Sequence, residues 1–229
     1  MSIHLERELD RLKRDVLTCG AMVEEAIEKS MVALDERRVE LAEKVVQEDE
    51  KIDQLEVEIE ESCLKILALH QPVAQDLRFL AAVIRINNDL ERVGDYAVSI
   101  AERTLEFAKF SIPTPKNLKV LGGVARQMLR DSLDSFVKRD SGLARKVCSS
   151  DSEADRIHRE VFQEIRDRIF QHPDQIDALL DLLTTARRLE RIADMATNIA
   201  QDVVYMVEGK IIRHRWVGES GSNQTKERR

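Results

Sequence analysis

Residues 90–102 read LERVGDYAVSIAE, and residues 189–201 read LERIADMATNIAQ. Both stretches place an aspartate four residues after a glutamate and continue with Ala-x-x-Ile-Ala, and the glutamates, Glu91 and Glu190, are 99 residues apart. Apolar residues recur in both stretches at steps of three and four residues, which is the period of an amphipathic helix. One helical segment is therefore present twice in the chain.

The repetition extends beyond these two stretches. The acidic pair Asp49 and Asp53 recurs 102 residues later as Asp151 and Asp155. Around these pairs, the Ala, Lys and Val at 42, 44 and 45 recur at the same offset. Matching acids and apolar positions, in the same order, indicate an internal duplication.

Prolines divide the chain into helical segments. Proline cannot continue a helix and pushes the preceding residue out of helical space, so Pro72, Pro113, Pro115 and Pro173 predict three breaks. The order is helix, helix, proline, helix, linker, and then the same again. We therefore expect an all-α fold of six long helices in two tandem, pseudo-symmetric three-helix bundles with shallow antiparallel packing. The expected divisions are a first bundle over 1–110, a linker over 111–117, a second bundle over 118–213 and a flexible polar tail over 214–229.

Composition narrows the class of protein. Aromatic residues make up only 4% of the 229 residues, and the net charge of −7 disfavours a nucleic-acid partner, which would need a basic face. Cys19, Cys63 and Cys148 have no metal-site or disulfide spacing and suit a reducing compartment. The longest apolar run, 79–84, is far shorter than a membrane span, so we expect a cytoplasmic protein that reaches a membrane only through a partner.

Four pairs of acids are spaced four residues apart, which places each pair on one helical face. Like charges at this spacing disfavour a helix by roughly 0.2–0.5 kcal/mol, and a cation between them would remove that cost. The pairs, which we predict to bind metal, are Asp49/Asp53, Glu91/Asp95, Asp151/Asp155 and Glu190/Asp194.

Each helix has one of these acids directly after an apolar position, namely Asp53, Glu91, Asp155 and Glu190, so the pairs stand beside the apolar stripe and not in its centre. The second and third helix of each bundle would then offer their carboxylates to a shared groove, a donor set that suits hard cations. Glu56 and His158 occupy similar positions and are weaker candidates. The alternative is an ordinary charged surface, because a single pair of this kind signifies little; four matched pairs favour the metal site.

An enzymatic role has little support in the sequence. A di-metal carboxylate enzyme built in a helical bundle needs Glu-x-x-His on two helices, whereas this chain has only Asp155 and His158 at that spacing. The arginines near the acids are interpreted as ion-pair partners, with a phosphate-facing role as the alternative. We therefore predict no enzyme, and keep the di-metal enzyme and a metal-free helical scaffold as alternatives.

Long stretches of the chain resemble the PhoU family. They are HLERELDRLKRDVLTCGAMVEEAI (4–27), QPVAQDLRFLAAVIRINNDLERVGDYA (71–97) and RRLERIADMATNIAQDVVYMVEGKIIRH (187–214), so the resemblance covers nearly the whole chain. It implies two tandem three-helix bundles whose E/D-x-x-x-D motifs bind metal clusters at the bundle surface. Iron is the metal that the resemblance favours, with Mn, Mg or Zn as alternatives.

The resemblance also implies a role. It is that of a homodimeric cytoplasmic regulator that restrains phosphate uptake and represses the phosphate-starvation genes. The implied partners are the ATPase subunit of the phosphate ABC importer and a sensor histidine kinase. The second bundle departs from the family pattern E-R-I-G-D-H-A-T-N, because Ala193 replaces the Gly and Met195 replaces the His. We therefore expect a weaker or differently built site at Glu190 and Asp194.

Overall fold

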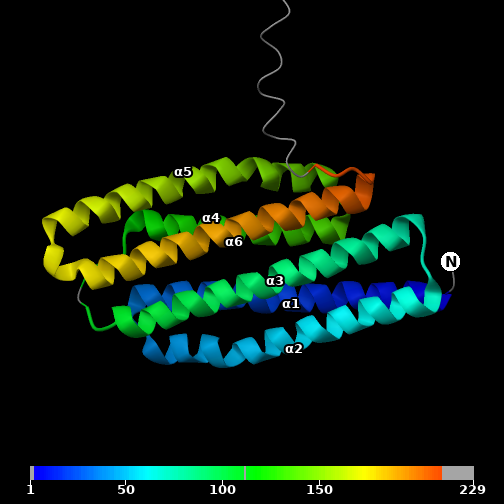
Figure 1. Ribbon diagram of the computed structural model, residues 1–229, viewed down its shortest axis with the longest axis horizontal. Helices are drawn as coiled ribbons and strands as arrows, with labels where there is room; N and C mark the ends of the chain where they lie inside the picture. The colour runs from blue at the N-terminus through cyan, green and yellow to red at the C-terminus, as the bar shows by residue number, and fades with distance from the viewer. Residues whose placement is uncertain (1–2, 111, 213–229) are drawn as a thin grey trace, which may run out of the picture.

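The computed structural model describes residues 3–110 and 112–212, and in these ranges it contains six long α-helices, one short 3-10 turn and no strand (Figure 1). The prediction of an all-α fold with six long helices is confirmed. The predicted tail, 214–229, lies outside the described residues. The helices are α1 (Ile3–Glu36), α2 (Val39–His70), α3 (Ala74–Phe107), α4 (Lys116–Lys138), α5 (Ser141–Gln171) and α6 (Ile176–Glu208).

Local sequence explains where the helices begin and end. Asp140 caps α5, since its Oδ1 accepts hydrogen bonds from the backbone N–H groups of Gly142 (2.9 Å) and Leu143 (3.0 Å). Helix α2 ends at a left-handed Gln71, directly before Pro72, and α6 ends at Gly209, whose φ of 70° suits glycine. The prolines therefore end helices where the sequence predicts breaks.

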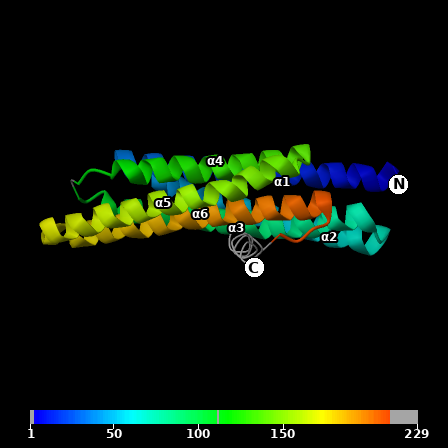
Figure 2. The same ribbon diagram turned by 90° about the horizontal axis from the view of Figure 1, so that it is seen from above.

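The helices form two sets of three that lie side by side along an elongated molecule (Figure 1). Helices α1, α2 and α3 pack against one another, as do α4, α5 and α6. The two sets meet where α3 packs on α6 and where α1 packs on α4, which lie together along one edge in Figure 2. The α2–α3 turn and the α5–α6 turn lie at opposite ends of the molecule (Figure 1).

One hydrophobic core runs through both sets. Leu90 and Val93 of α3 and Leu189 and Ile192 of α6, from the two stretches that repeat, are fully buried in a single cluster that includes side chains from all six helices. A shared core of this kind makes the halves mechanically continuous. The division into two domains thus stays a prediction, although the helices group as expected.

The α1–α4 contact repeats the internal symmetry. A Cβ added at Gly20 would lie 2.5 Å from Cδ1 of Leu133, and one added at Gly122 would lie 3.1 Å from Cε of Met31. Gly122 is 102 residues after Gly20, and Leu133 is 102 residues after Met31. Each half therefore supplies a glycine that receives an apolar side chain of the other half.

Ion pairs hold the register of the same two helices. Basic side chains of α4 face acidic side chains of α1 along its length: Lys119 with Asp35 at 2.6 Å, Arg126 with Glu28 at 2.7 Å, and Arg130 with Glu24. These pairs are partly exposed, so each contributes less than about 1 kcal/mol. Their ordered succession favours a single alignment of α1 against α4.

Candidate functional site

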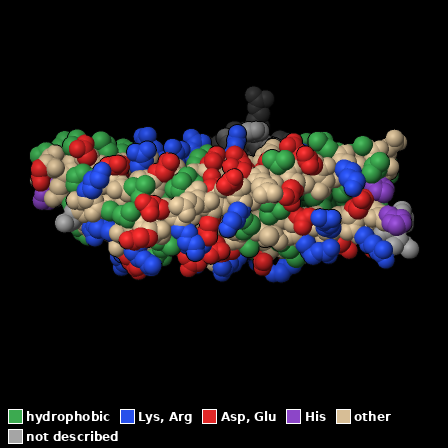
Figure 3. Space-filling view, turned by 90° about the horizontal axis from the view of Figure 1, so that it is seen from below, with side chains coloured by type: hydrophobic (Ala, Val, Ile, Leu, Met, Phe, Trp, Pro, Cys, Tyr) green, Lys and Arg blue, Asp and Glu red, His purple; other side chains and the backbone are tan. Residues whose placement is uncertain are grey.

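The structure brings the acids of α2 and α3 together in a first acidic cluster, composed of Asp49, Asp53 and Glu56 from α2 with Glu91 and Asp95 from α3. Burial raises the pKa of Asp49 to about 6, and the neighbouring charges of Asp53 and Asp95 act in the same direction. Burial raises the pKa of Glu91 too, helped by Asp95, Asp53 and Glu56. Carboxylates from two helices therefore share one electrostatic environment. Figure 3 shows acidic side chains gathered near the middle of the face viewed from below.

Gly94 sets how closely α3 approaches this cluster. A Cβ on Gly94 would lie 3.3 Å from Oδ1 of Asp49, tighter than most contacts of this kind. A side chain at position 94 would therefore require the Asp49 carboxylate to shift by a few tenths of an ångström at the point where the two helices meet.

Asn87 belongs to the first cluster, although the spacing of the acids does not point to it. It lies one turn before Glu91, is 1% exposed, and donates through Nδ2 to the backbone oxygen of Glu56 at 2.9 Å. Its Oδ1 is buried and has no hydrogen-bond partner among the described residues. A buried amide oxygen without a donor is a further candidate ligand for a hard cation. The signal for it in the sequence is an Asn on the apolar face of a helix, where burial of an amide needs a reason.

A second acidic cluster lies at the matching place in the other half. Its members are Asp151 and Asp155 from α5 with Glu190 and Asp194 from α6, and His158 follows Asp155 by three residues on α5. Burial raises the pKa of Asp194 to about 6, the charges of Glu190 and Asp151 add to the rise, and Arg191 opposes it. The predicted acids of α5 and α6 are thus brought together as well.

The second cluster is more internally satisfied than the first. Asp151 accepts a hydrogen bond from Oγ1 of Thr197 at 3.1 Å, a contact that lowers its pKa against the larger effect of burial. Arg191 lies 3.9 Å from carboxylate oxygens of both Glu190 and Asp194. In the first cluster, no ion pair reaches Asp49 within the described part of the chain. The first cluster therefore leaves more negative charge uncompensated.

Met195 and His158 decide which nitrogen ligands the second half can offer to a metal ion. Met195, where the family pattern has His, is 7% exposed and packs in the core. His158 is half-buried, and its Nε2 is buried without a hydrogen-bond partner among the described residues. His158 could therefore supply a nitrogen ligand to this cluster, which the first cluster lacks.

The donors suit a cation chemically, but their side chains do not converge. Within residues 3–110 and 112–212, no three His, Cys, Asp or Glu side chains are placed to hold one metal ion. Carboxylates with raised pKa values repel one another, so side chains spread apart are what electrostatics favours. The oxygen-rich first cluster fits Mg, Mn or iron better than Zn, which prefers Cys and His. Metal binding by the predicted residues stays a prediction.

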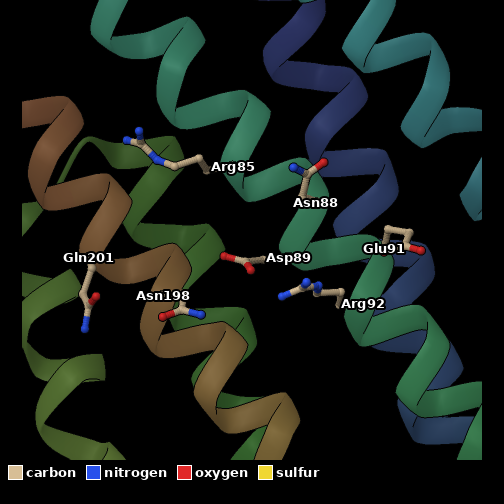
Figure 4. Close-up of a pocket in the computed structure, with 7 residues that line it drawn as sticks. All are labelled: Arg85, Asn88, Asp89, Glu91, Arg92, Asn198 and Gln201. Atoms are coloured by element: carbon tan, nitrogen blue, oxygen red, sulfur yellow. The ribbon is translucent and has the colours of Figure 1, made fainter. Parts of the chain in front are cut away.

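A polar cavity of ≈ 570 Å³ lies between α3 and α6, beside the first cluster (Figure 4). Arg92 and Asp89 extend into the space between the two helices, whereas Glu91 leaves the opposite side of α3 (Figure 4). Arg85 donates from Nε to Oδ1 of the buried Asp202 at 2.9 Å and stacks over the ring of Tyr205. Basic and acidic groups balance here, so the cavity has no strong preference for anions. The remaining lining residues are Asn88, Asn198 and Gln201.

Both sets of three helices match one known family. The model of the PhoU domain family matches residues 16–104 and 118–203, one match for each set. None of the helices in the described ranges is long and apolar enough to cross a membrane.

Relatives match along nearly their full length. The phosphate-specific transport system accessory protein PhoU homolog of Aquifex aeolicus is 38% identical over 95% of this chain and 99% of its own. The accessory protein PhoU of Escherichia coli is 32% identical over 90% of this chain and 86% of its own. The crystal structure of PhoU from Pseudomonas aeruginosa superposes with a TM-score of 0.86, at 32% identity over 90% of this chain and 99% of that chain. The crystal structure of the phosphate transport system regulatory protein PhoU from Streptococcus pneumoniae superposes with a TM-score of 0.83, at 31% identity over 90% of this chain and 98% of that chain. With both halves matched by the family model, the chain belongs to the PhoU family.

Proposed function

We propose that this chain is a non-enzymatic, cytoplasmic accessory protein of the phosphate-specific transport system, which restrains phosphate uptake and represses phosphate-starvation genes. One observation carries the proposal: a protein named as an accessory protein of the phosphate-specific transport system is 38% identical over 95% of the chain. The pseudo-symmetric bundles support an adaptor, because a stiff molecule with one continuous core can present fixed surfaces to other proteins. The partners are the ATPase subunit of the phosphate importer and a sensor histidine kinase, and the active form is a homodimer; the family resemblance supports both.

The acidic clusters give the adaptor its cation-binding sites. The carboxylates of Asp49, Asp53, Glu91 and Asp95 hold the ion in the first half, with Glu56 and the amide oxygen of Asn87 at its edge. A bound cation supplies positive charge that offsets the repulsion among these groups. In the second half Asp151, Asp155, Glu190 and Asp194 play the same part, with His158 as the added nitrogen donor. The bond from Thr197 and the charge of Arg191 make this second site the weaker one.

Elemental analysis tests the site assignment. Converting Asp49, Asp53, Glu91 and Asp95 together to Asn or Gln should abolish metal bound by the first half, measured by mass spectrometry on purified protein. A control variant with four exposed acids of the same helices neutralised, Glu43, Glu50, Glu102 and Glu106, should keep its metal. Equal metal content in both variants would reject the assigned ligands.

A gene deletion tests the regulatory role. Cells that lack the chain should express alkaline phosphatase in high phosphate, whereas the complemented strain should repress it. Pull-down of the purified importer ATPase, with and without chelator, tests the direct contact and its dependence on metal. Persistent repression in the deletion strain would refute the role.

A metal-free scaffold is the second candidate, favoured by the absence of three convergent ligands in the described residues. In that case chelated protein should bind the ATPase as tightly as metal-loaded protein. A loss of binding on chelation, restored by added metal, would exclude this candidate.

A further inference from the structure

The net negative charge of the protein is concentrated on one helix. Helix α2 carries ten Asp and Glu against three Lys, a net charge of −7, which equals that of the whole chain. Its counterpart after duplication, α5, carries six Asp and Glu against six Lys and Arg and is neutral. The two halves have therefore diverged in surface charge while keeping the same fold.

The outward face of α2 also exposes apolar side chains. Val46, Val57 and Leu64 are 37%, 49% and 55% exposed, and their spacings of 11 and 7 residues place them on one side of the helix. The residues found 102 positions later, on α5, are Cys148, Arg159 and Arg166. Two of the three matching positions in the second half thus carry arginine where the first half has an apolar side chain.

Acidic side chains flank these apolar residues, and no basic side chain in the described ranges pairs with them. Glu50 and Glu61 are exposed and form no ion pair among the described residues, whereas Glu48, nearer α1, pairs with Lys29 at 2.6 Å. Figure 3 views the molecule from the side of α2, the lowest helix in Figure 1, and shows acidic, basic and hydrophobic side chains interspersed on that face. Mutual repulsion among uncompensated charges lowers the stability of the fold, and exposed apolar side chains lower its solubility, so a binding role gives this combination a reason.

We propose that this face, the α2 ridge formed by Val46, Glu50, Val57, Glu61 and Leu64, docks a basic amphipathic helix of a partner protein. Charge complementarity selects Lys and Arg on both sides of the partner's apolar stripe, and the stripe itself packs on Val57 and Leu64. From Val46 to Leu64 the ridge is about 27 Å long, which matches a partner helix of about 18 residues. The proposal rests on the proposed function only in that an accessory protein requires a partner.

Two peptides and three variants test the α2 ridge. Fluorescence anisotropy would compare an 18-residue helix with a Leu stripe flanked by Lys and a scrambled peptide of the same composition, each titrated with the full chain. We expect the scrambled peptide to bind at least about tenfold more weakly, since only the amphipathic one aligns apolar with apolar groups. We expect Val57→Ser with Leu64→Ser, and separately Glu50→Lys with Glu61→Lys, each to weaken binding about tenfold.

The matched control changes the same amount of charge on the other half. Glu153→Lys with Glu160→Lys, at exposed acids of α5, should alter affinity less than about twofold. Equal binding of the two peptides, or an equal loss in the α5 control, would overturn the proposal. So would wild-type affinity in both ridge variants, whose folding circular dichroism can check.

Other occupants of the ridge give distinct results. If wild-type protein sediments as a dimer and the ridge variants sediment as monomers, a second copy of the chain occupies the face and the proposal is wrong. If the peptide binds only after residues 213–229 are deleted, this segment of the chain covers the ridge, which also overturns it. Failure of the importer ATPase to bind wild-type protein, with peptide binding intact, would count against the proposed function and leave the ridge supported.

Discussion

The raised pKa of Asp49 predicts that Asp49→Asn stabilises the metal-free protein at neutral pH. A folded-state pKa of about 6, against an ordinary value of about 3.9, corresponds to about 3 kcal/mol of penalty on the ionised form. Asp49 is only half-buried, so screening by solvent reduces the expected gain to about 1 kcal/mol. For a chain of 229 residues, this raises the melting temperature by about 2 °C.

The pH dependence provides the sharper measurement. Above about pH 6 the carboxylate is ionised in both folded and unfolded chains, so the full penalty is present and the variant should be the more stable. As the pH falls through about 6 toward 3.9, the folded chain takes up its proton first and the penalty disappears. Urea unfolding of chelated protein between pH 4 and pH 8 would measure the difference in stability between Asp49→Asn and wild type at each pH. Glu50→Gln, at an exposed position, is the control, and its difference from wild type should stay nearly constant with pH. A variant less stable than wild type at pH 7, or a difference independent of pH, would refute the reasoning.

Four further substitutions test packing and polar contacts, each by urea unfolding at pH 7. Gly123→Ala should raise the free energy of unfolding by up to about 1 kcal/mol, since open space surrounds that helical position. Gly20→Ala should lower the free energy of unfolding by about 1–2 kcal/mol, because the added methyl group overpacks the α1–α4 contact. Equal effects of the two substitutions would reject the assigned contact. Thr197→Val should cost about 1 kcal/mol by removing the hydroxyl that donates to a half-buried carboxylate, and an unchanged stability would mean that water replaces the donor. Arg85→Leu should cost about 3 kcal/mol because it leaves Asp202 buried without this partner, and a loss below about 1 kcal/mol would show that other groups hold that carboxylate.

Much of the fold follows from the sequence because its signals are local. The breaks at Pro72 and Pro173 and the 3–4 spacing of apolar residues depend only on backbone sterics and helical period. The pairing of the two halves is different. Periodicity identifies an apolar stripe but not which neighbour covers it, and the glycine contacts of α1 with α4 join residues more than 90 positions apart.

The candidate site is predictable to a similar depth. The spacing of Asp49 and Asp53 and their position beside the apolar stripe are sufficient to place them opposite the acids of α3. Asn87 is not predicted, because its role depends on its burial against Glu56 and not on any spacing within the motif. The sequence predicts only part of the difference between the two clusters, because the hydrogen bond from Thr197 to Asp151 joins two different helices.

The reciprocal glycine contacts have a consequence for the history of the chain. Each half carries both a glycine that receives an apolar side chain and an apolar side chain that packs on the glycine of the other half. These residues are Gly20 and Met31 in the first half, and Gly122 and Leu133 in the second. A surface that carries both parts is self-complementary, which is the requirement for an isologous two-fold dimer. A solitary ancestral half could thus have associated with its own copy through this surface, and gene fusion then freed the two copies to specialise separately.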